Sequence, residues 1–246
     1  MKIAYLLRKL HTILDSLVHL KMLTKVLDGV IPDTYCRLDQ KWLHDYRFDT
    51  VLDIGSNIGR FAVTASAVFP NAKVYAFEPL PECYEQTRRA LAKIGKGEAF
   101  NVGLGDHNEM VSINRSSHLP SSSFLPMART HTEAFKFAAH QEQVDVKVSR
   151  LDDIPQMLSL GESILVKIDV QGFERAVIAG GRNTIAKAKV VLIELSYEEL
   201  YVGQPLFAEV FELLSGLGFK FAGTLAQMPH PDDGRMLDAD CLFVRA

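Results

Sequence analysis

The sequence contains few cysteines, no excess of positive charge and no long uninterrupted apolar run. Its 246 residues include three cysteines, Cys36, Cys83 and Cys241, whose odd number and wide spacing exclude a disulfide framework and a zinc motif. The formal net charge of -3 offers no general attraction to nucleic acid, so we expect no nucleic-acid partner. Sparse cysteine is typical of a reducing compartment, and we expect a cytoplasmic location.

Residues 1–27 carry apolar side chains at three- and four-residue spacing, which predicts an amphipathic helix. Charged residues interrupt the segment, so it cannot span a bilayer, and it lacks the cleavage site of a signal peptide. We expect this helix to pack on the domain; weak contact with a membrane surface and contact with a protein partner are the alternatives. Residues 1–48 are thus predicted to be a helical extension of a domain at 49–246.

From residue 50 onward, apolar strands and helices alternate, which favours an α/β fold with a parallel sheet. The expected strands are residues 51–54, 73–77, 99–104, 163–170 and 190–195. The expected helices are residues 58–69, 82–94, 173–186 and 206–217. Two closing strands, at 219–223 and 241–245, are joined by a turn-rich segment and should form an antiparallel pair.

The middle of the chain departs from this alternation. Residues 110–113 and 144–148 alternate apolar and polar side chains, as antiparallel strands with one solvated face do. Between them, residues 115–140 are rich in serine, histidine and proline. We interpret this segment as a variable, mobile loop that forms a lid or a substrate surface, with a plain solvent loop as the alternative.

Acidic residues stand at the ends of several predicted strands, namely Asp53, Glu78, Asp106, Asp169 and Glu194. The carboxyl ends of parallel strands meet at one edge of a sheet, so we expect these acids to converge there. A ligand should bind at the same edge, at the point where the strand order switches direction.

The loop after the first strand reads DIGSNIG, with Gly55, Asn57 and Gly59 at alternate positions. It lacks the middle glycine of the dinucleotide fingerprint and the lysine of a phosphate-binding P-loop. Asp53, which precedes the loop, would repel a pyrophosphate. S-adenosylmethionine fits this loop better, because it carries an ammonium and a sulfonium but no phosphate.

Each acid then has an expected role toward that cofactor. Asp53 is expected to hold the ammonium directly or through water, and Glu78 to accept hydrogen bonds from both ribose hydroxyls. Asp106 is placed to reach the adenine amino group. Gly55 and Gly59 would let the backbone approach the ligand closely. Ordinary capping or surface acids are the alternative for Asp53 and Glu78.

Several longer segments carry a family resemblance. VLDIGSNIGRFAVTAS (51–66) and VYAFEPLPECYEQTRRAL (74–91) resemble the first two strand–helix units of class I methyltransferases. SILVKIDVQGFERAVIAGG (163–181) is similar to the signature of the FkbM family, and the chain's closing strands also resemble that family's. The likeness extends over about residues 31–245, and Ser56 stands where family members often have alanine.

The resemblance implies a Rossmann-like class I methyltransferase fold. Such a fold has a mostly parallel seven-stranded sheet, an antiparallel C-terminal strand pair and helices on both faces. The resemblance also implies S-adenosylmethionine-dependent O-methylation, often of a hydroxyl on a sugar, a glycan or a glycosylated natural product. The partner is then a small-molecule or glycan acceptor.

Methyl transfer to a hydroxyl needs a group that takes up the hydroxyl proton. Asp169 is the first candidate, either as base or to orient the acceptor, although it could instead cap the following turn. Glu174 and Glu194 are further candidates as active-site acids, and each could be structural. Lys167 could pair with an acid and hold it ionised, or lie at the sheet edge. Asp169 and Glu174 have no obvious third partner, so we expect no metal site.

Two other interpretations share this architecture. An NAD-dependent oxidoreductase is disfavoured by the missing middle glycine and by Asp53. A non-catalytic relative that keeps the fold as a binding module is disfavoured by the retained loop, Glu78 and Asp169, which suit cofactor binding but do not establish turnover.

Overall fold

The computed structural model describes residues 25–154 and 158–246. Most of the amphipathic segment at 1–27 lies outside these residues, so its predicted contacts stay predictions. Within the described ranges, no helix is both long and apolar enough to cross a membrane. Helices α3 (Pro32–Leu38) and α4 (Lys41–His44) precede the first strand, and their Leu38 and Leu43 are buried in an apolar cluster with residues of the main sheet.

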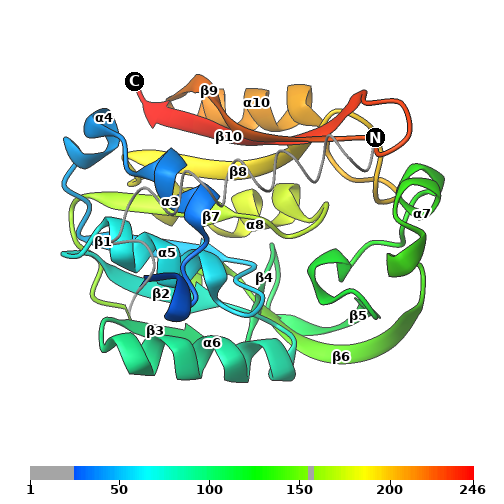
Figure 1. Ribbon diagram of the computed structural model, residues 1–246, viewed down its shortest axis with the longest axis horizontal. Coiled ribbons are helices and arrows are strands. Elements are labelled where there is room, and N and C mark those ends of the chain that lie inside the picture. Colours follow the sequence, from blue (N-terminus) through cyan, green and yellow to red (C-terminus); the bar gives the residue numbers. More distant parts are fainter. Residues whose placement is uncertain (1–24, 155–157) are drawn as a thin grey trace.

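Seven strands form the main sheet, in the order β3-β2-β1-β7-β8-β10-β9 (Figure 1). Their bounds are β1 (Thr50–Ile54), β2 (Lys73–Phe77), β3 (Gly97–Phe100), β7 (Ile164–Ile168), β8 (Val190–Ser196), β9 (Phe219–Pro229) and β10 (Met236–Arg245). The first five in spatial order run parallel, whereas β10 is antiparallel to both of its neighbours. The predicted, mostly parallel sheet with an antiparallel C-terminal pair is confirmed.

Helices cover both faces of this sheet, as expected. They are α5 (Arg60–Val68), α6 (Pro81–Ile94), α8 (Glu174–Gly180), α9 (Arg182–Ile185) and α10 (Phe207–Gly216). Successive strand residues alternate between two apolar clusters, because neighbouring side chains of a strand point to opposite faces. Leu165 packs with residues of α5 and α6, whereas Val166 packs with residues of α8, α9 and α10.

A second, three-stranded sheet lies beyond the carboxyl ends of the parallel strands (Figure 1). It contains β4 (Gly103–Leu104), β5 (Glu109–Ser116) and β6 (Gln141–Ser149) in the order β4-β6-β5. The predicted antiparallel strands at 110–113 and 144–148 are confirmed, because Met110 pairs with Lys147 and Val111 with Val146.

The single strand predicted over 99–104 is wrong, because the chain turns after Phe100. The Asn101 side chain donates hydrogen bonds to the backbone oxygens of Glu78 and Pro79, at 3.0 and 2.9 Å. This side-chain competition with the ladder ends β3. Gly103 and Leu104 then pair with β6 in the second sheet.

The continuous helix predicted over 173–186 is also wrong, since α8 ends at Gly180 and α9 begins at Arg182. A Cβ atom at Gly180 would lie 1.8 Å from the backbone oxygen of Gly105, so only glycine permits this close approach. The Asp152 carboxylate, in the middle of the 3-10 turn at Leu151–Asp153, accepts hydrogen bonds from the N–H groups of Asn183 and Thr184. The second helix is therefore held separately.

The segment between β5 and β6 contains α7 (Arg129–Ala134) and two 3-10 turns, at Leu119–Ser121 and Lys136–Ala138. We call residues 117–140 the cover segment. It lies at the same end of the molecule as the carboxyl ends of β1 and β7 (Figure 1). Ser123 Oγ donates a 2.6 Å hydrogen bond to the backbone oxygen of Gln171, which links the cover segment to the turn after β7.

Candidate active site

The DIGSNIG loop connects β1 to α5 through two glycines in left-handed backbone conformation. Gly55 has a φ of 77°, and a Cβ atom there would lie 1.8 Å from the backbone oxygen of Asp169. Gly59 has the same φ, and its Cβ would meet Thr87 at 3.0 Å. Gly55 is therefore required for the close approach of the ends of β1 and β7. This approach is between two backbone segments, whereas the sequence suggested an approach to a ligand.

Asp53, at the base of this loop, is completely buried. Neither carboxylate oxygen has a hydrogen-bond partner within the described residues. The nearest cation is Lys167, whose Nζ lies 3.8 Å from Asp53 Oδ1. Burial raises the pKa of Asp53 to about 6, and the charge of Lys167 only partly offsets this. A buried acid with unsatisfied oxygens suits a site that gains a donor or a water when a ligand binds.

Glu78 follows β2 and faces the same space. Its Oε2 accepts a 2.8 Å hydrogen bond from Asn57 N–H, and its Oε1 accepts one of equal length from Leu80 N–H. Burial raises the pKa of Glu78 to about 7, although these two N–H groups favour the ionised form. Each carboxylate oxygen keeps a second acceptor position. Glu78 thus fixes the DIGSNIG loop and can still accept hydrogen bonds from a ligand.

A charged cluster lies at the carboxyl ends of β7 and β8. Lys167 Nζ is 2.9 Å from Asp169 Oδ2, which confirms the predicted pairing of Lys167 with an acid. Burial opposes ionisation of Asp169, but the Lys167 charge and the hydrogen bonds from Lys167 and Gln171 together outweigh it, so the pKa of Asp169 lies below its usual range. Burial and the charges of Asp169, Asp238 and Asp240 raise the pKa of Glu194 well above its usual range. The ionised form is therefore favoured at Asp169, whereas the protonated form is favoured at the neighbouring Glu194.

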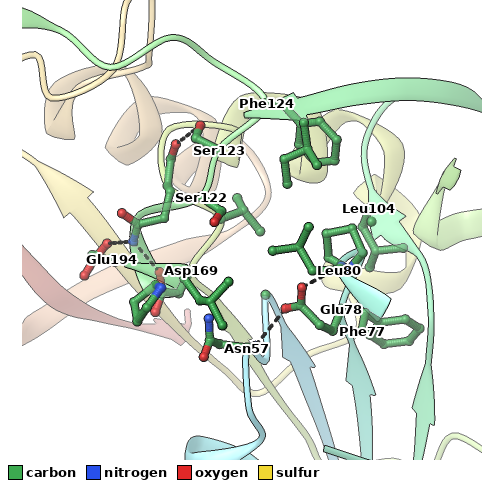
Figure 2. A pocket seen from close by; sticks show the side chains of 18 residues that line it. Asn57, Phe77, Glu78, Leu80, Leu104, Ser122, Ser123, Phe124, Asp169 and Glu194 are labelled. Atoms are coloured by element: carbon green, nitrogen blue, oxygen red, sulfur yellow. Dashed lines mark hydrogen bonds between the residues drawn. The ribbon is translucent and has the colours of Figure 1, made fainter. Parts of the chain in front are cut away.

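These groups border one cavity of about 190 Å³. Figure 2 shows Asp169 and Glu194 on one side of it and Glu78 on the other, with Leu104 and Phe124 nearby. The charged residues that line the cavity are Glu78, Asp169 and Glu194, and no lysine, arginine or histidine of the described ranges lines it. A cavity whose charged lining residues are all acidic repels phosphate and attracts a cationic ligand. This charge argues against a dinucleotide and fits a sulfonium cofactor.

The sequence model of the methyltransferase FkbM domain family matches residues 53–221. This range includes the DIGSNIG loop and every residue of the charged cluster. The chain belongs to the FkbM methyltransferase family. It is therefore an enzyme, and its cofactor is S-adenosylmethionine.

Two relatives, NoeI and FkbM, agree with this assignment. The chain is 28% identical over 193 residues to 2-O-methyltransferase NoeI of Sinorhizobium fredii, covering 76% of this chain and 77% of that one. It is 27% identical over 208 residues to 31-O-demethyl-FK506 methyltransferase FkbM of Streptomyces tacrolimicus, covering 72% and 77%. A solved methyltransferase FkbM from Methylobacillus flagellatus has a TM-score of 0.49 at 15% identity; the match covers 80% of this chain and 44% of that one.

The structure brings five of the nine site residues expected from the sequence to the cavity wall, namely Gly55, Asn57, Glu78, Asp169 and Glu194. Asp53 and Gly59 lie behind the wall, where they shape the loop. Asp106 does not line the cavity. Its half-exposed side chain lies 3.0 Å from the His107 ring, beside a separate groove. The reason is the turn after Phe100, which the predicted strand did not include.

Glu174, also expected as an active-site acid, is buried outside the cavity wall of this FkbM-family methyltransferase. Its Oε1 accepts a 3.1 Å hydrogen bond from Gly172 N–H, so the carboxyl holds the turn before α8. Burial raises the pKa of Glu174 to about 7. This geometry supports the structural alternative for Glu174.

Glu174→Gln should flatten the dependence of stability on pH. The folded pKa of about 7 lies above the ordinary value of 4.5, so this group stabilises the fold below pH 4.5. That contribution, roughly 3 kcal/mol, is lost as pH rises toward and through 7. Melting temperatures from pH 5 to pH 8.5 should fall less for the variant than for the native chain. If the melting temperatures of the variant and the native chain changed with pH in parallel, this role for Glu174 would be contradicted. Glu98→Gln, at an exposed position of β3, is the control.

Sequence reasoning missed Gln171, Ser123 and Phe124, which also line the cavity of the methyltransferase. Gln171 lies within the motif that carries the family resemblance, between Asp169 and Gly172. A polar side chain in a glycine turn after a strand was the available signal for it. Ser123 and Phe124 belong to the cover segment, whose position depends on long-range contacts. Within the described residues, no group of three metal-ligating side chains could hold an ion.

Proposed function

We propose that this methyltransferase methylates a hydroxyl of a sugar, a glycan or a glycosylated natural product. The proposal rests chiefly on the ionised Asp169 carboxylate, which faces the cavity next to the cofactor loop. Two relatives are named for transfer to oxygen, at a 2-O and a 31-O position. The polar side of the cavity, with Asp169, Gln171 and Glu194, suits a ligand that carries several hydroxyls.

S-adenosylmethionine, when bound, supplies an electrophilic methyl group on a positively charged sulfur. In our proposal, the DIGSNIG loop holds this cofactor with Gly55 and Asn57 at the cavity wall. Asp53 favours its ammonium from beneath the loop, directly or through water. Glu78 accepts hydrogen bonds from its ribose hydroxyls through the acceptor positions that Asn57 and Leu80 leave available.

Asp169 accepts the proton of the acceptor hydroxyl, which makes that oxygen a stronger nucleophile toward the methyl group that the cofactor would supply. Lys167 keeps Asp169 ionised before the reaction, because its Nζ lies 2.9 Å from the carboxylate. Burial and neighbouring carboxylates favour the protonated form of Glu194, and in that form it can donate a hydrogen bond to a second oxygen of the acceptor. The cavity of about 190 Å³ is smaller than the roughly 300–1,000 Å³ of typical ligand pockets.

The proposal assigns catalysis to residues 49–246 and treats 1–48 as an extension. The family match begins at residue 53 and supports this division. The sparse cysteines support a cytoplasmic location.

Glu78→Gln should weaken binding of S-adenosylhomocysteine, the demethylated cofactor, by about 10–100-fold, because the ribose hydroxyls lose a charged acceptor. Calorimetric titration measures the effect. An analogue that lacks the 2′-hydroxyl provides the matched control, since native chain and variant should differ less in affinity for it. Equal losses for both ligands would assign Glu78 to the loop alone. Failure of the native chain to bind either ligand would refute the proposed function.

A further inference from the structure

The side chain of Gln171 lies at the centre of the catalytic carboxyls, and its backbone is held in an uncommon conformation. Its φ of 52° is left-handed, which is rare for a residue other than glycine. Ser123 Oγ fixes the Gln171 backbone oxygen at 2.6 Å. At the next residue, Gly172, a Cβ atom would meet Tyr201 and Gln204 at 3.1 Å. The turn is therefore clamped between the cover segment and the chain near Tyr201.

The side-chain amide of Gln171 makes three hydrogen bonds: it donates two, which uses both of its N–H groups, and it accepts one. Its Nε2 donates to Asp169 Oδ1 at 2.8 Å and to Glu194 Oε2 at 2.7 Å. Tyr201 donates its hydroxyl proton to Gln171 Oε1 at 2.8 Å. Figure 2 draws as dashed lines the hydrogen bonds that join Gln171 to Asp169, Glu194 and Ser123. This set fixes the amide orientation, because the opposite orientation would place an oxygen acceptor against the carboxyls.

We propose that Gln171 is the positioning residue of the methyl-transfer site: its amide holds the carboxyl groups of Asp169 and Glu194 at a fixed separation, and Tyr201 orients the amide. This inference rests on the proposed function, in which Asp169 receives the acceptor proton. Gln171 acts on the reaction through the two carboxyls rather than by taking the proton itself.

The two carboxyls gain from such a bridge because both are half-buried, both bond to the same nitrogen, and they would repel each other if both were ionised. Lys167 holds Asp169 from one side at Oδ2, and Gln171 holds it from the other at Oδ1. No lysine or arginine of the described residues bonds to the Glu194 carboxyl, which accepts its hydrogen bond from Gln171. The other titratable groups that act on the pair are Asp53 on β1, Lys167 on β7, Glu174 on α8, Asp238 and Asp240 on β10, and Tyr201.

Tyr201 is itself held in place by contacts with the cover segment. Its ring is buried, and its hydroxyl also lies 3.1 Å from the backbone oxygen of Ser121 and 3.4 Å from His131 Nε2. The single hydroxyl proton of Tyr201 is shared between Gln171 Oε1, the nearer acceptor at 2.8 Å, and the Ser121 oxygen at 3.1 Å. His131 Nε2–H can donate to the Tyr201 oxygen. The carboxyls are thereby connected, through Gln171 and Tyr201, to the segment that covers the cavity.

The test compares Gln171→Met and Tyr201→Phe with the native chain. Methionine approximates the shape of glutamine without its hydrogen bonds, and phenylalanine removes only the hydroxyl. Gln143→Met, at an exposed position of β6, is the matched control. Carbon-13 NMR follows the titration of the Asp169 and Glu194 carboxyls. The variants Asp169→Asn and Glu194→Gln assign the two carboxyl signals. The affinity of each sample for S-adenosylhomocysteine is measured in parallel.

Gln171→Met should raise the titration midpoint of Asp169 by about one pH unit, because the ionised form loses a hydrogen-bond donor. Tyr201→Phe should raise it by a smaller amount, and Gln143→Met should leave it unchanged. Affinity for S-adenosylhomocysteine should stay at the native value in all three variants. When the enzyme is assayed with an acceptor that it methylates, the acid limb of the pH profile of kcat/KM should move to higher pH by the same amount as the Asp169 midpoint.

An unchanged Asp169 titration midpoint in either Gln171→Met or Tyr201→Phe would overturn the inference. Because either variant is sufficient, the test still works if the other variant does not fold. Loss of S-adenosylhomocysteine affinity in Gln171→Met would also overturn it, because Gln171 would then hold the cofactor or the fold. Failure of the native chain to bind S-adenosylhomocysteine would refute the proposed function instead, whatever the midpoints show.

Discussion

Asp169→Asn should lower the rate of methyl transfer by about 10²–10⁴-fold and leave S-adenosylhomocysteine affinity unchanged. Asparagine has the shape of aspartate, and its side-chain oxygen can still accept the bond from Gln171. It cannot take up the proton of an acceptor hydroxyl at neutral pH. The effect should therefore fall on the chemical step, which single-turnover kinetics at saturating cofactor measures.

The Asp169→Asn experiment needs a control for lost charge, because the asparagine amide would face the Lys167 ammonium that Asp169 now pairs with. Asp145→Asn, at an exposed position of β6, removes one negative charge far from Lys167 and should leave the rate at the native level. An unchanged rate in Asp169→Asn would remove Asp169 from the reaction. Equal losses of rate and cofactor affinity would assign Asp169 a role in cofactor binding or folding.

The sequence predicted the convergence of Asp53, Glu78, Asp169 and Glu194 because one rule governs it. Each residue lies at the end of a short apolar strand, and parallel strands bring such ends to one edge. Residue type added the charge argument, since a loop that begins with an acid and lacks lysine does not suit a phosphate. Local pattern and strand direction were sufficient for this part of the site.

The parts that the sequence did not predict depend on contacts between distant segments. The position of Asp106 follows from Asn101, whose side chain ends β3 by bonding to backbone oxygens more than twenty residues earlier. The role of Gln171 depends on a left-handed φ and on Tyr201, thirty positions later. No periodicity or propensity encodes such pairings. The loop glycines illustrate the same limit, because Gly55 matches a ligand-binding motif but is required by a neighbouring strand.

Gly55→Ala should lower the free energy of unfolding by about 4 kcal/mol, through left-handed backbone strain and overpacking together. The added Cβ would lie 1.8 Å from the Asp169 backbone oxygen. The Cβ atom is fixed by the Gly55 backbone and the oxygen belongs to the Asp169 backbone, so neither can rotate away from the other. Relief would separate β1 from β7, break the 3.0 Å bond from Asp169 N–H to the Ile54 oxygen and displace the Asp169 carboxylate. Binding of S-adenosylhomocysteine should be lost as well.

Gly95→Ala is the matched control for this prediction. Gly95 has a φ of 73°, close to that of Gly55, but a Cβ atom there would meet no atom within 4 Å. It should therefore cost only about 1 kcal/mol, from backbone strain alone. Urea unfolding of the two variants beside the native chain separates strain from steric clash. Equal destabilisation would show that the contact with Asp169 imposes no cost. A large excess for Gly55→Ala would establish that this glycine sets the distance between the DIGSNIG loop and the Asp169 carboxylate.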